Sequence, residues 1–135
     1  MSEVKLLGRE DILKASDVKM ETVQVPEWGG AVLVKALSGV ERDDYEESIM
    51  IRGKKGAYEV NTRLMRAKLV AASIVDAKGK AIFSEDDLEV LSKKSAAALD
   101  RVFKVAQRLS GLTEEQVQES AARLEGAQES ASVSA

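Results

Sequence analysis

Acidic residues between Asp76 and Glu89 come nearest, by type and spacing, to a site that could do chemistry. Asp76 opens a stretch with the outline of a calcium-binding loop, which needs oxygen ligands at positions 1, 3 and 5 and a glycine at position 6. Positions 3 and 5 are Lys78 and Lys80, and position 6 is Ala81. Because these residues replace the ligands and the glycine, we expect a turn followed by a helix cap, and no metal ion.

Four carboxylates gather directly after this turn, at Glu85, Asp86, Asp87 and Glu89. Paired carboxylates can act as general acid and general base. They are also favoured at the positive N-terminal end of a helix, and Ser84 just before them is a suitable N-cap. We therefore interpret the cluster as the start of a helix.

The composition excludes most other catalytic machinery, because the chain has no histidine and no cysteine. Histidine is the commonest general base and metal ligand, and cysteine supplies disulfides and thiolate metal sites. The run Gly53-Lys54-Lys55-Gly56 lacks the G-x-x-x-x-G-K-[ST] frame of a phosphate-binding loop. We expect neither an enzyme nor a protein with a cofactor.

A local basic stretch runs from Arg52 to Lys68 in a chain whose net charge is −3. Nucleic-acid interfaces combine a basic surface with aromatic side chains, and Tyr58 is the only aromatic residue in this stretch. We expect a solvated face or a surface for an acidic protein partner, and no nucleic acid. Trp28, the only tryptophan, could anchor either the core or an interface. The candidate partner-binding residues are Trp28, Arg52, Lys54, Lys55, Arg63 and Arg66.

The chain is long enough for one domain, with 135 residues of which 44% are hydrophobic and only 4% aromatic. Its core should therefore consist of aliphatic side chains. No apolar run reaches the ~18 residues that span a bilayer, and the N-terminus lacks the apolar region of a signal peptide. We expect a soluble cytoplasmic protein that contacts no membrane.

The strongest local pattern predicts an antiparallel hairpin over residues 21–37. Val23 and Val25 alternate with polar residues, and Gly29-Gly30 can adopt the positive φ angles of a tight turn. Pro26 lacks an N–H group, which suits the entrance to the turn.

Helical spacing and capping residues predict a mainly α-helical body after the hairpin. Ser38 and Glu41 have the spacing of a capping box, and Asn61 or Thr62 could cap the second helix. The two glycines and three cations of residues 52–56 indicate a mobile loop between these helices. Helices are expected at 39–51, from 61 or 62 to about 75, from 84 through 91, at 96–109 and from 113 to about 124, with a short extended segment at 81–83. The six expected core residues are Leu69, Val70, Ile74, Leu99, Val102 and Phe103.

The predicted fold class is α+β, with an N-terminal antiparallel β-hairpin followed by about four to five helices. Residues 1–20 form an N-terminal segment in which 8–18 are compatible with a short helix. Residues 21–125 form a single compact domain. Residues 126–135 are rich in Ala and Ser and contain Glu129, so we expect a disordered acidic tail.

Residues 23–46 carry the pattern V-x-V-P-E-W-G-G-x-V-x-V-x-x-L-S-G-x-E-R-D-x-Y/F-E. Further matching segments follow in order at 69–76, with Gly79 and Phe83 after them, at 94–99 and at 106–112. Together they cover roughly residues 6 to 120, and their order and spacing resemble the tail assembly chaperones of long-tailed, non-contractile bacteriophages.

The resemblance implies a protein that binds the tape measure protein in the cytoplasm of the bacterial host and keeps it soluble. It also implies recruitment of tail tube subunits and absence from the finished virion, and it is compatible with self-association. An alternative is a structural component of the tail or of the head–tail connector. A transcriptional regulator is a further alternative, since residues 99–124 contain two predicted helices joined by a glycine turn, but the second helix is acidic, which disfavours phosphate contact.

Overall fold

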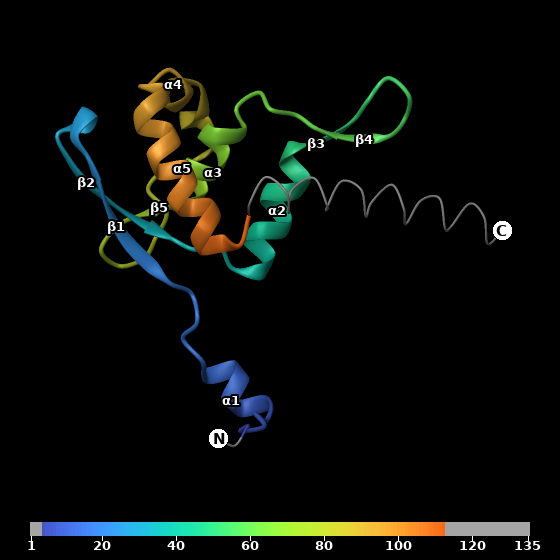
Figure 1. Cartoon of the computed structure of the whole chain (residues 1–135), viewed down its shortest axis with the longest axis vertical. Coiled ribbons are helices and arrows are strands. Elements are labelled where there is room, and N and C mark those ends of the chain that lie inside the picture. The colour runs from blue at the N-terminus through green and yellow to red at the C-terminus, as the bar shows by residue number, and fades with distance from the viewer. Residues whose placement is uncertain (1–3, 113–135) are drawn as a thin grey trace.

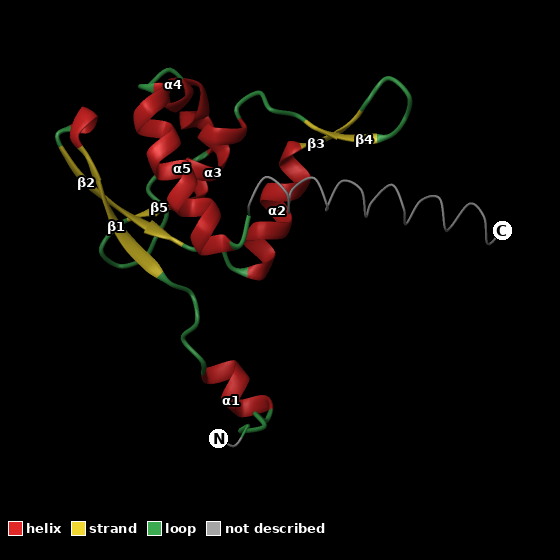
Figure 2. Cartoon of the chain, viewed as in Figure 1, coloured by secondary structure: helices red, strands yellow, loops and turns green. Residues whose placement is uncertain are grey.

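The computed structural model describes residues 4–112, which form an α+β fold of a small antiparallel sheet and a helical body (Figures 1 and 2). The predicted α+β class is therefore confirmed. The helix predicted from Thr113 and the tail at 126–135 lie outside the described residues.

The predicted hairpin is present as β1 (Met20–Val25) and β2 (Gly30–Lys35), which pair antiparallel along their whole length. A single 3-10 turn, Pro26–Trp28, joins them, and Gly29 follows in the left-handed region with φ 79°. Glycine adopts this angle without steric cost, so it can end the turn and start β2.

A third strand, β5 (Ile74–Val75), extends the sheet in the order β1-β2-β5. The predicted second helix ends at about residue 75, but α3 (Met65–Ser73) ends two residues earlier. The prediction was wrong because β2 offers a free edge at this point: Leu33 pairs with Val75, and Val34 pairs with Ile74. The segment predicted to be extended at 81–83 contributes an isolated bridge from Ala81 to Val75.

The expected capping residues fix the ends of two other helices. At α2 (Gly39–Ile49), Ser38 and Glu41 exchange hydrogen bonds, with the Ser38 N–H donating to the Glu41 carboxylate at 2.9 Å. At α5 (Ala96–Ser110), the Ser95 hydroxyl accepts from the Ala98 N–H at 3.2 Å. The short α4 (Leu88–Ser92) follows a 3-10 turn, Glu85–Asp87.

Residues 50–60 form a second hairpin that the sequence did not predict. Here β3 (Met50–Arg52) pairs antiparallel with β4 (Tyr58–Val60). The helix predicted at 39–51 ends at Ile49, because Met50 and Ile51 belong to β3. The Gly53 N–H donates to the Ala57 carbonyl at 2.7 Å to close the turn between the strands. Strands of three residues are too short to show an alternating pattern, so sequence periodicity could not reveal them.

The start of α3 also differs from the prediction. Leu64, with φ 61°, stands directly before the helix, and neither Asn61 nor Thr62 occupies that position. Asn61 instead accepts the Arg63 N–H at 3.1 Å with its side-chain oxygen, forming a turn before the helix. This local bond competes with helix capping and explains why the prediction failed.

The core lies between α5 and α3 on one side and the inner face of β1 and β2 on the other. All six residues predicted for the core are buried, with Phe103 only 3% exposed. The core is aliphatic, as the composition indicates.

The N-terminal helix α1 (Arg9–Lys14) matches the short helix expected near the start of the chain. It buries no residue, and Figure 1 shows it apart from the body, beyond the start of β1. Among residues 4–112, no helix is long and apolar enough to cross a bilayer.

Candidate functional site

The first hairpin is held against α5 by two arginines of that helix, one at its turn and one near the start of β1. Arg101 forms an ion pair with Glu27 in the turn, and Arg108 contacts Glu21 at 2.7 Å near the start of β1. Hydrogen bonding from Arg101 holds the pKa of the Glu27 carboxyl below its usual range. The two arginines are seven residues apart, so they lie on the same side of α5 and fix the tilt of the hairpin.

The fixed hairpin places Trp28 over α4, where it borders an apolar pocket of about 410 Å³. We call it the Trp28 pocket, and its walls are Trp28, Phe83, Asp87, Val90, Leu91 and Lys94. Trp28 is half-buried and packs against the core, while Val90 remains 65% exposed. Trp28 therefore packs against the core with part of its side chain and borders this pocket with another part.

The second hairpin carries three of the predicted partner-binding residues. The Arg52 guanidinium lies 5.1 Å from the centre of the Tyr58 ring and donates a hydrogen bond to the Gly56 carbonyl at 3.0 Å. Lys54 and Lys55 occupy the turn and are exposed. Arg52 therefore supports the hairpin, while the two lysines, which we call the hairpin lysines, present their charge to solvent.

Arg63 and Arg66 stand at the start of α3 and line a second pocket of about 460 Å³ between α3 and α4. Arg63 lies 3.8 Å from the Glu89 carboxylate, and Arg66 lies 3.5 Å from that of Asp100. A hydrogen bond from Lys104, and then the charge of Arg66, lower the pKa of the Asp100 carboxyl. Both arginines thus have carboxylate partners within the chain.

The six predicted residues consequently fall into three groups: Trp28 at the first hairpin, Arg52 with the hairpin lysines at the second, and Arg63 with Arg66 at the start of α3. They do not form one continuous site. Arg52 and the hairpin lysines are exposed and have no ion-pair partner within residues 4–112, but Arg52 is engaged by the Tyr58 ring and the Gly56 carbonyl.

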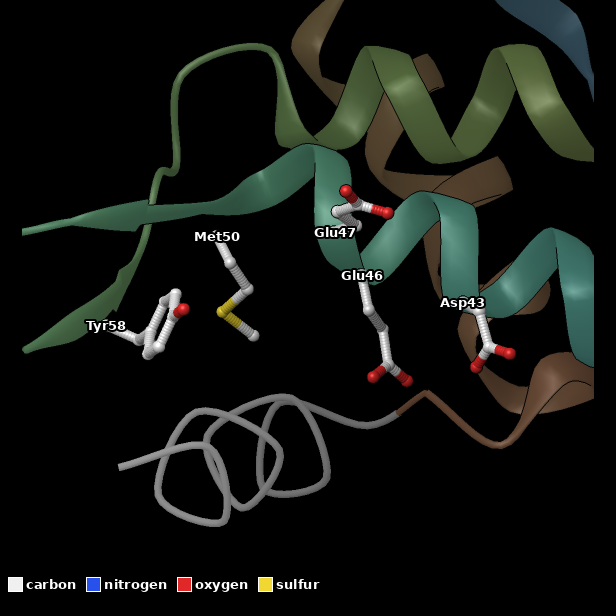
Figure 3. Close-up of a pocket in the computed structure, with 5 residues that line it drawn as sticks. All are labelled: Asp43, Glu46, Glu47, Met50 and Tyr58. Atoms are coloured by element: carbon white, nitrogen blue, oxygen red, sulfur yellow. The ribbon is translucent and has the colours of Figure 1, made fainter. Parts of the chain in front are cut away.

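An acidic pocket of about 500 Å³ was not predicted (Figure 3). Its carboxylates, Asp43, Glu46 and Glu47, project from α2, and Met50 and Tyr58 of the second hairpin complete its wall. The spacing of the three acids at i, i+3 and i+4 places them on one helix face and was the available sequence signal. Arg42 neutralises part of this charge through a contact of 2.7 Å with Glu46.

The acidic residues first considered for chemistry have structural roles. Asp76 accepts the N–H groups of Lys78 and Lys80 at 2.8 and 3.1 Å and so forms the expected turn. Asp87 accepts the Ser84 N–H at 2.9 Å and so holds the start of the 3-10 turn Glu85–Asp87, whereas the helix expected from Ser84 begins only at Leu88. Within the part of the chain that the structure describes, no group of His, Cys, Asp or Glu is arranged to hold a metal ion.

Comparison with known proteins places the chain in a family. Residues 10–123 match the family model described as phage tail assembly chaperone. A search of solved structures finds the tail assembly chaperone of bacteriophage HK97, with a TM-score of 0.51 and 23% identity over 74% of this chain and 90% of that one. That likeness concerns the fold, and no curated protein matches the sequence. Because the family model covers most of its length, this chain belongs to the phage tail assembly chaperone family.

Proposed function

We propose that this chaperone binds the tape measure protein during tail assembly and keeps it soluble in the cytoplasm of the bacterial host. It helps to recruit tail tube subunits and leaves before the virion is complete. The observation that carries the proposal is the family match over residues 10–123.

The hairpin lysines are the best candidates for contact with the client. Lys54 and Lys55 are exposed at the turn of a small, well-defined hairpin, and Arg52 is occupied in holding that hairpin together. Two adjacent unpaired cations attract a carboxylate-bearing surface over about 8–10 Å at physiological salt. An acidic stretch of the tape measure protein is therefore the partner that this surface fits.

Co-expression with the cognate tape measure protein tests the proposal. The client should move from the pellet to the soluble fraction when the chain is present. Equal insolubility with and without the chain would contradict the chaperone function itself.

Charge reversal then tests the surface. The double substitution K54E/K55E should reduce the amount of soluble client and weaken the complex. The affinity that remains should depend less on the salt concentration. The matched control is K78E/K80E, which reverses two exposed lysines in the glycine turn at 76–80. If both variants solubilise the client as well as the parent, the client contact lies elsewhere while the chaperone function stands.

The alternative, a structural component of the tail or head–tail connector, would remain in the finished virion. An assembly factor should be absent from purified virions, or present only in traces, by mass spectrometry. Recovery in a fixed ratio to the tail tube protein would favour the structural component.

A further inference from the structure

The three-stranded sheet has one long open edge, and it belongs to β1. The strand order is β1-β2-β5, so β1 and β5 are the two edge strands. The β5 edge is short, with two residues, and the isolated bridge from Ala81 to Val75 covers part of it. By contrast, β1 has 6 residues, and within residues 4–112 no strand or bridge pairs with its outer edge. The edge of β1 is therefore available for pairing.

Alternate residues of β1 turn their main-chain groups toward this edge. The Ala36 N–H donates to the Lys19 carbonyl at 2.8 Å, and the register of the hairpin continues from this pair. Because hydrogen-bonded and non-hydrogen-bonded pairs alternate along an antiparallel ladder, every second residue after Lys19 bonds to β2 and those between point outward. The outward residues, which we call the edge residues, are Met20, Thr22 and Gln24. All three are exposed, and their main-chain groups make no hydrogen bond within residues 4–112.

The edge residues lack the usual protection against pairing with another chain. Natural sheets cover an open edge, interrupt it with proline or a bulge, or place lysine on it. None of the edge residues is charged or proline, and β1 pairs with β2 without a bulge along its whole length. Pro26 stands just beyond the end of the strand. An exposed row of unpaired donors and acceptors fits the main chain of an extended segment, which is how strand addition works.

Arg101 and Arg108 favour acidic side chains in such a segment. They reach Glu27 and Glu21 from the flank of α5 that lies next to β1, whereas another side of α5 packs on α3. The inward-facing side chains of an added strand would lie beside these two guanidiniums, which keep 40% and 60% exposure. A guanidinium has several N–H donors, so each can bind a second carboxylate. Acidic residues at alternate positions of the segment therefore complement this flank.

The same arginines make a second copy of the chain a poor occupant of the edge. Antiparallel pairing of two β1 edges relates the copies by a twofold axis perpendicular to the sheet, so both α5 helices lie on one face. Arg101 and Arg108 of one copy would then approach the same two residues of the other. Juxtaposed like charges oppose association, so the charges favour a different, acidic protein.

We propose that the edge of β1 binds an extended, acidic segment of a partner protein as an additional strand of the sheet. The main chain of the segment pairs with the edge residues, and its inward carboxylates face Arg101 and Arg108. The partner is the client of the chaperone, so in this respect the inference rests on the proposed function.

A synthetic peptide of alternating threonine and glutamate, as long as β1, tests the edge without any client. In amide exchange followed by NMR, the N–H groups of the edge residues should exchange rapidly in the free protein and become protected when the peptide is added. A peptide with lysine in place of glutamate should bind about tenfold or more weakly, because its charges would face the two arginines. Unchanged exchange at the edge residues, or equal binding of the two peptides, would overturn the proposal.

Proline substitution tests whether the main chain makes the contact. Thr22→Pro removes one outward N–H, and Thr22→Ala is the matched control because it loses the same hydroxyl and keeps the N–H. That N–H takes no part in pairing with β2, so both variants should fold, and Trp28 emission can check this. T22P should bind the acidic peptide about tenfold or more weakly than T22A, since the ring also obstructs the added strand. If T22P does not fold, Gln24→Pro and Gln24→Ala provide the same comparison. Equal binding within a folded pair contradicts the proposal.

Co-expression with the cognate tape measure protein separates this inference from the proposed function. T22P should leave more of the client insoluble than T22A does. If the two variants solubilise the client equally well, the edge does not bind the client and the inference fails, while the chaperone function stands. If the parent itself does not solubilise the client, the chaperone function fails, and the peptide measurements still decide whether the edge accepts an acidic strand.

Discussion

Arg101 and Glu27 join two elements that are 74 positions apart in the sequence, the central helix α5 and the turn of the first hairpin. The Arg101 guanidinium donates to both carboxylate oxygens of Glu27, and the second of these hydrogen bonds measures 3.1 Å. A two-point contact fixes direction as well as distance. It therefore orients the turn that carries Trp28, and with it one wall of the Trp28 pocket.

Replacing Arg101 with glutamine should disturb the hairpin tip more than it disturbs the whole fold. The pair is partly exposed, with side-chain exposures of 40% and 30%, so its loss should lower the melting temperature only slightly. Trp28 should become more exposed, and its fluorescence emission should shift to longer wavelength. The control is R9Q, which removes the largely exposed pair of Arg9 and Glu10 on α1 and should change neither signal. Unchanged Trp28 emission in R101Q would show that other contacts orient the turn.

The same ion pair should make the hairpin sensitive to acid. Hydrogen bonds from Arg101 and from the Glu27 backbone hold the pKa of the folded Glu27 carboxyl below 4.5, its ordinary value. A carboxyl whose pKa is lower in the folded state contributes stability above its unfolded pKa and loses it as the pH falls through the folded pKa. The difference in melting temperature between the parent and R101Q should thus be constant near neutral pH and should shrink below pH ~4. A difference that persists unchanged at pH ~3 would contradict this role.

Phe103 should be among the most costly core residues to truncate. It is 3% exposed, and the guanidinium of Arg66 lies 5.7 Å from the centre of its ring. Phe103→Ala should lower the free energy of unfolding by about 3–5 kcal/mol in chemical denaturation. The control V40A removes methyl groups from a residue that is 67% exposed and should cost less than about 0.5 kcal/mol. Similar values for the two variants would mean that Phe103 is not part of the core.

The sequence predicts well where several local signals agree. At the first hairpin, three signals indicate the same structure: the alternation of Val23 and Val25, the glycine turn and Pro26. The structure has β1 and β2 paired antiparallel there. At α2 and α5, serine caps and helical spacing agree in the same way. Elements that depend on a partner distant in the sequence could not be predicted. An example is β5, which is a strand because Ile74 and Val75 pair with the edge of β2.

The candidate site shows the same limit. Six residues were grouped because they are close in the sequence or chemically conspicuous, and the fold separates them. The decisive fact about Arg63 and Arg66 is that Glu89 and Asp100 face them, from α4 and α5. No pattern within residues 52–68 contains that information, so sequence alone could not distinguish these paired arginines from the unpaired hairpin lysines.

The unusual backbone of Leu64 offers a last test. Among residues 4–112 it is the only non-glycine residue with a positive φ, at 61°, and it stands directly before α3. Side chains with a Cβ are strained there by about 1–2 kcal/mol, whereas asparagine tolerates the left-handed region because its short polar side chain bonds locally. Leu64→Asn should therefore be more stable than Leu64→Ala by about 1 kcal/mol in chemical denaturation, although both lose the same half-buried apolar contact. Equal stability of the two variants would mean that residue 64 relaxes out of the left-handed region, and that α3 does not require it there.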